Sequence, residues 1–172
     1  EIAGATKEDV RELVASQGKF EARIGNDNVF TGEVSDSRDI VFVCRNDGTC
    51  SGIRDCQESA SGQACSFEFS IKLSPGAAER HAALTKDLEV NLSAGGRGVL
   101  SKNLDFYLDG KLYDSLFIGA DLKGKQAIDI AISGPGYGLT AEEAFNDANK
   151  NMNKLQTILE TGSLPTKLEI VE

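Results

Sequence analysis

Four cysteines are the residues whose type and spacing point most directly to a chemistry: Cys44, Cys50, Cys56 and Cys65. They fall in one short stretch that is rich in Gly, Ser, Asp and Asn. A zinc site fits poorly, because there is no C-x-x-C pair and His81 is the only histidine. Disulfides suit a loop that cannot build its own core, and they are favoured over zinc or free thiols. Two disulfides predict an oxidising, extracytoplasmic location.

The pairing of the cysteines is open, because four cysteines allow three pairings. We favour the nested pairing on a geometric argument. Cys44 ends one strand-like run and Cys65 opens the next. If these runs form a hairpin, the two cysteines face each other at its neck, near the Cα spacing that a disulfide needs. Cys50 and Cys56 then pair in the tip.

Other candidate residues favour structural roles. His81 lies on a helix expected over 75–89 and has no nucleophile or carboxylate at a diagnostic spacing, so packing or surface placement is expected. The run Gly95-Gly96-Arg97-Gly98 lacks the phosphate-loop spacing and is interpreted as a connector. The spacing of the loop aspartates does not fit a calcium loop, which favours solvation; these are Asp36, Asp39, Asp47 and Asp55.

One modification motif is present. Asn91-Leu92-Ser93 is an N-glycosylation acceptor pattern, which is usable only outside the cytoplasm. No nucleophile–base pair or metal cluster stands out, so we expect no enzyme activity, no cofactor and no metal. A secreted hydrolase is the disfavoured alternative.

The elements before residue 66 are short. Thr6 caps an expected helix that Gly18 ends. Alternating apolar residues over 20–24 predict a strand, and a short partner strand is expected near Phe30. Residues 31–39 are polar and predict a loop.

The pattern is more regular after the cysteine stretch. Residues 66–73 predict a strand, and Ser74-Pro75 begins the expected 75–89 helix, whose core face would be Ala78, Ala82, Thr85 and Leu88. Strands over 104–108 and 112–118 flank Asp109-Gly110, a strong hairpin turn. A strand over 128–132 follows, and the glycine-rich run 134–138 is expected to break it.

The last helix has the clearest local signal. Thr140 and Glu143 form a capping box. An apolar stripe follows at three- and four-residue steps, and its members are Ala141, Ala144, Phe145, Ala148, Met152, Leu155 and Leu159. Gly162 is expected to end the helix, Leu164-Pro165 forbids continuation, and 167–171 predicts a closing strand.

This order predicts an α+β fold. From Ser66 onward it is typical of a ferredoxin-like βαββαβ base, with a central hairpin and both helices on one face of an antiparallel sheet. Residues 1–65 would add a helix, strands and the disulfide-pinned loop, packed on the 66–172 base as one compact domain. An exposed sheet edge can recognise polypeptide backbone, and the strand beginning at Leu112 and the short one near Phe30 are edge candidates.

Charge and hydropathy exclude several classes. The formal net charge is -9, from 27 acidic and 18 basic residues, and an acidic surface disfavours nucleic-acid binding. No apolar run approaches the length needed to span a bilayer, so the chain as given is expected not to insert into a membrane. It begins at Glu1 without a signal peptide, and we interpret it as an excised or processed piece.

The C-terminal part resembles the end of the first large extracytoplasmic domain of the SecD family. Thr140 and Glu143 match the family's helix start. Gly162, Leu164 and Pro165 match an ending that precedes a transmembrane helix, with Ser163 in place of the usual alanine.

Two upstream motifs extend the resemblance. Leu108-Asp109-Gly110-Lys111 resembles the family's strand–turn motif, and Phe67-Glu68-Phe69 resembles an earlier strand. The cysteine loop and the Gly95–Gly98 stretch depart from the bacterial pattern, which indicates an archaeal member.

The resemblance implies a role in protein export. It places the domain on the extracytoplasmic side of the cell membrane, where it engages emerging unfolded preprotein and assists ion-gradient-driven export. It implies SecF and the SecY-containing translocon as partners, reached through membrane segments outside this chain. The alternative is a secreted or membrane-anchored ligand-binding domain unrelated to export, since the fold alone does not fix function.

Overall fold

A computed structural model describes residues 20–31, 39–92 and 98–163. The expected first helix, the 167–171 strand, and Leu164 and Pro165 lie outside these residues. The strands are β1 (Phe20–Ile24), β2 (Asp27–Thr31), β3 (Ile40–Val43), β4 (Ser51–Ser59), β5 (Gly62–Leu73), β6 (Val90–Leu92), β7 (Gly98–Leu100), β8 (Leu104–Leu108), β9 (Lys111–Leu116) and β10 (Asp129–Gly138). The helices are α2 (Pro75–Thr85), the short 3₁₀ helix η1 (Ala120–Leu122) and α3 (Ala141–Ser163).

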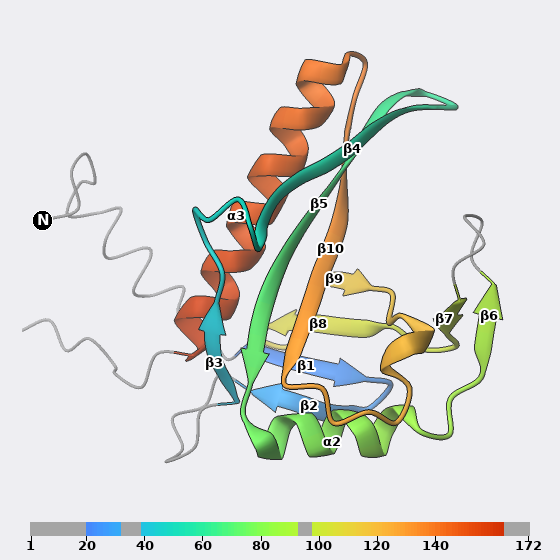
Figure 1. The fold of residues 1–172 in the computed structure, drawn as a ribbon, viewed down its shortest axis with the longest axis vertical. Coiled ribbons are helices and arrows are strands. Elements are labelled where there is room, and N and C mark those ends of the chain that lie inside the picture. Colours follow the sequence, from blue (N-terminus) through green and yellow to red (C-terminus); the bar gives the residue numbers. More distant parts are fainter. Residues whose placement is uncertain (1–19, 32–38, 93–97, 164–172) are drawn as a thin grey trace, which may run out of the picture.

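The fold is α+β, as predicted, and its strand pairs are antiparallel (Figure 1). One sheet has the order β2-β1-β8-β9. The second has the order β10-β5-β3, with β4 also paired to β5, and β6 and β7 form a separate ribbon. Helix α3 packs along β10 and β5, whereas α2 packs mainly on β2. Strands from both sides of residue 65 therefore pair with each other in each large sheet.

Several local predictions are confirmed. Ser74 caps α2, because its side chain accepts a hydrogen bond from the Ala77 backbone N–H. Asp109 and Gly110 both have positive φ, as a two-residue hairpin turn requires. Helix α2 is shorter than expected and ends at Thr85, and its buried face includes His81 as well as the predicted alanines.

The expected sheet of the ferredoxin-like base is not observed. The order strand, helix, hairpin, strand, helix is present, but the β8–β9 hairpin pairs with β1 and not with β5. The reason is apolar packing across that sheet: Phe106 stacks on Phe20, and Phe30 of β2 lies against both rings. The N-terminal strands thus extend the hairpin's own sheet at the edge of β8.

The glycine-rich run does not break the chain as expected. Strand β10 continues through it and stays in register with β5, with Gly134 opposite Phe67 and Gly138 opposite Gln63. A side-chain carbon at Gly136 would collide with the backbone of Ala148, and one at Gly138 with that of Ala144. These glycines let α3 lie directly on the strand.

The stripe on α3 also differs in part from its prediction. Ala144, Ala148, Met152, Leu155 and Leu159 are buried as expected. Phe145 and Ala141, which the predicted stripe included, are exposed. The capping box forms, with the Glu143 N–H donating to Thr140 and the Thr140 N–H donating to the Glu143 carboxylate. The helix passes through Gly162, where an end was expected, to Ser163.

Replacing Gly136 by alanine is expected to lower the free energy of unfolding by about 2 kcal/mol or more, because overpacking at backbone contact cannot relax by a side-chain rotation. Gly52→Ala is the matched control, since nothing lies within 4 Å of a side-chain carbon there. Urea unfolding followed by circular dichroism measures both. Equal stability of the two variants would contradict the close contact of helix and strand.

Candidate functional site

All four cysteines form disulfides, as predicted, but the nested pairing is wrong. The structure joins Cys44 to Cys50 and Cys56 to Cys65. The reason is the register of β5. Along the chain, β4 comes between β3, which ends before Cys44, and β5, which contains Cys65. Strand β4 pairs with β5 and places Cys56 opposite Cys65. The Cys44 N–H instead donates to the Ser70 carbonyl, five residues further along β5, so Cys44 and Cys65 are too far apart to pair.

Helix α3 holds the first disulfide loop in place. The buried Gln156 amide donates to the Cys44 carbonyl and to the Ser51 hydroxyl, both at 2.9 Å. Arg45 forms a 2.7 Å ion pair with Glu160. The sequence analysis did not single out Gln156. The only sign of its role in the sequence is that it is a polar residue beside the apolar stripe. The disulfides are therefore part of the packed structure and not a reactive site.

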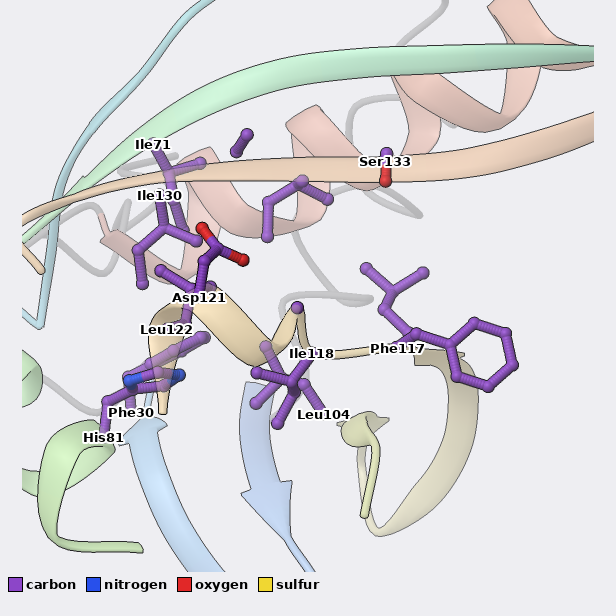
Figure 2. A pocket seen from close by; sticks show the side chains of 14 residues that line it. Phe30, Ile71, His81, Leu104, Phe117, Ile118, Asp121, Leu122, Ile130 and Ser133 are labelled. Carbon is purple, nitrogen blue, oxygen red and sulfur yellow. The ribbon is translucent and has the colours of Figure 1, made fainter. Parts of the chain in front are cut away.

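A cavity of about 200 Å³ lies between the two large sheets. Strand β10 lines it with residues 130–133, and the segment from Leu116 to Leu122 lines the opposite side. Phe117 lies at one end and His81 with Phe30 at the other (Figure 2). The lining is mostly apolar, and its polar side chains are His81, Asp121 and Ser133. Such a cavity can bind an apolar group and orient it with few polar contacts.

His81 is the buried polar group of this cavity. Its side chain is 2% exposed, and Nδ1 has no hydrogen-bond partner among the described residues. Burial lowers the pKa of His81, while a hydrogen bond to the Lys125 backbone opposes that shift. The ring is therefore neutral near pH 7, and Nδ1 offers a lone pair if the other ring nitrogen carries the proton. The expected packing role is correct, although its place in a cavity was not foreseen.

Among the described strands β10 is an outer strand of its sheet, and its outward edge borders the same cavity. Near the start of α3 this edge is closed by side chains: Asp147 accepts from the Tyr137 N–H at 2.9 Å, and Asn151 donates to the Pro135 carbonyl at 3.2 Å. The strands predicted as edges, β9 and β2, are the outer strands of their sheet. The sequence analysis missed the edge of β10, because its glycines and proline indicated a loop.

The remaining candidate residues that the structure describes do not assemble into a site; Asp36 lies outside the described residues. Asp39 accepts from Arg80 and from the Thr31 N–H. Asp47 caps its own turn, where the hydrogen bonds from Thr49 lower the pKa of Asp47. Among the described residues no group of three or more His, Cys, Asp or Glu side chains could hold a metal ion. Asn91 is exposed on β6.

Comparison with known proteins bears on the predicted resemblance. The chain is 28% identical over 172 residues to the protein-export membrane protein SecD of Methanothermobacter thermautotrophicus. It resembles an archaeal SecD. This similarity confirms the predicted resemblance to SecD, and the archaeal source of that protein matches the predicted branch of the family. The alignment covers 99% of this chain but 34% of that protein, so the chain spans about a third of its relative's length.

Two other comparisons found nothing: no protein-family model and no solved structure matches the chain. Within the described ranges, neither α2 nor α3 has the length and apolar character of a membrane-crossing helix.

Tryptic mapping without reduction tests the disulfide pairing. Trypsin separates the cysteines into three peptides, 39–45, 46–54 and 55–72. The structure predicts that the first two stay joined and that 55–72 carries an internal disulfide, because Cys56 and Cys65 lie opposite each other. Mass spectrometry distinguishes this result from the other two pairings, each of which joins all three peptides. A single three-peptide species would contradict the structure.

Proposed function

We propose that this chain is an extracytoplasmic domain of the SecD subunit of the Sec translocation machinery. It engages emerging unfolded preprotein and assists export that an ion gradient drives. SecF and the SecY-containing translocon are its partners through the rest of the protein. The observation that carries this proposal is similarity to a SecD protein along nearly the whole chain.

Two structural features support the proposal. Two disulfides suit a domain that works on the oxidising side of a membrane. The described surface also exposes several large apolar side chains, including Phe42, Phe117 and Tyr137. Exposed apolar groups suit weak, sequence-tolerant contact with unfolded chains.

Photo-crosslinking in membranes tests the proposal on the full-length protein. A photoreactive amino acid replaces Phe42, Phe117 or Tyr137, which are exposed on different elements. A preprotein arrested during export is expected to crosslink to at least one position, because it passes the domain unfolded. The control is the exported substrate protein after it has been released and has folded. This folded substrate is expected not to crosslink.

Absence of crosslinks to arrested preprotein from all three positions would overturn the proposal. Saturable binding of one defined small ligand would then favour the alternative of a ligand-binding domain unrelated to export.

A further inference from the structure

We propose that the groove between β10 and the Leu116–Leu122 segment binds an extended polypeptide segment and takes one of its aromatic side chains into the cavity beside His81. This inference deepens the proposed function and rests on it, because its ligand is polypeptide. It adds a defined site, a binding mode and a side-chain preference.

The backbone of β10 supplies the first half of the site. In an antiparallel strand, successive residues direct their N–H and C=O groups alternately toward the two neighbours. The Ile128 carbonyl points toward β5 and accepts from the Leu73 N–H. The Pro135 carbonyl and the Tyr137 N–H point away from β5 and form hydrogen bonds with side chains of α3. The register with β5 is unbroken over 129–138, so Ala131 and Ser133 also direct their backbone groups outward.

These outward groups lie where the cavity is. Both Ala131 and Ser133 line it and are exposed, and α3 covers neither of them with a bond like those at Pro135 and Tyr137. An extended chain that adds to a sheet edge satisfies such groups without regard to its sequence. Side chains of α3 already bind the outward groups of Pro135 and Tyr137, so an added strand can pair only with the half of β10 that borders the cavity.

The cavity supplies the second half of the site. Its volume of about 200 Å³ is below the roughly 300–1,000 Å³ of sites for whole drug-sized ligands, and it suits a single side chain. His81 lines the cavity, but its Nδ1 is fully buried, so it contributes the surface of its ring and no accessible hydrogen-bond acceptor. A flat apolar side chain, such as that of phenylalanine or tryptophan, complements this lining.

The occupant follows from the combination of edge and cavity. A small molecule would use the cavity but leave the strand edge unpaired, whereas an extended polypeptide uses both. A second copy of this chain is disfavoured, because each copy carries a net charge of -9 and the two repel each other. A neutral or basic unfolded segment has no such penalty.

Tryptophan fluorescence gives a direct test, because the protein contains no tryptophan. The probe is an unstructured ten-residue peptide of Thr, Ser and Lys with one central Trp, and peptides with central Phe or Ala compete against it. We expect the Trp peptide to bind with a blue-shifted emission. We expect the Trp and Phe peptides to bind at least about tenfold more tightly than the Ala peptide, because only they carry an aromatic side chain that the cavity can bury.

Two variants separate the halves of the site. Ser133→Pro removes the outward N–H and is expected to weaken binding about fivefold. Proline is tolerated at an outward edge position, as Pro135 shows two residues later. Ser133→Ala keeps the N–H and is the matched comparison: it is expected to bind more tightly than Ser133→Pro, and the difference between the two variants reports the contribution of the N–H. Phe117→Ala removes the exposed side chain at one end of the cavity and is expected to reduce the preference for the Trp and Phe peptides over the Ala peptide.

Amide chemical shifts of the wild-type domain provide a second measurement that needs no variant. Addition of the Trp peptide is expected to shift the signals of Ala131 and Ser133 and to leave those of β4 unchanged. Shifts confined to other elements, equal affinity of the two Ser133 variants, or equal affinity for the Trp and Ala peptides would overturn the inference. Crosslinking of arrested preprotein elsewhere on the domain would then still support the proposed function.

Discussion

The direct contact between α3 and β10 is the constraint on which the rest of the structure depends. Gly136 and Gly138 leave no side chain between the strand and Ala148 or Ala144 of the helix. Because of this contact, α3 packs on β10 and β5 and buries Ala144, Ala148, Met152, Leu155 and Leu159. Its more distant turns then reach the cysteine loop through Gln156 and Glu160. One helix thereby connects the strand edge, the long sheet and the disulfides.

The same contact divides the edge of β10 into two functional parts. Where the helix lies close, Asp147 and Asn151 bind the outward backbone groups and protect the edge from unwanted pairing. Where β10 leaves the helix, its edge meets the cavity between the sheets. This restriction suits the proposed binding of unfolded chains, because an open edge along the whole strand would also pair with other folded copies.

Local signals in the sequence predicted local structure well. The capping box at Thr140, the cap at Ser74 and the turn at Asp109-Gly110 each depend on a few neighbouring residues, and each is observed. Partner choice between strands was not predictable, because it depends on contacts between residues that are distant in the sequence. The pairing of β8 with β1 and the disulfide pairing both follow from such contacts. Glycines in β10 indicated a loop, since a sequence does not show that a helix will lie against them.

The candidate site escaped prediction for the same reason. Its edge, its cavity and His81 come from separate elements that meet only in the folded chain.

The most direct test of the central claim is the rate of protein export in cells in which this domain has been deleted from the full-length protein. Pulse-chase labelling of an exported protein is expected to show slower export without the domain and the normal rate after its restoration. An unchanged export rate with membrane insertion of the shortened protein intact would contradict the claim.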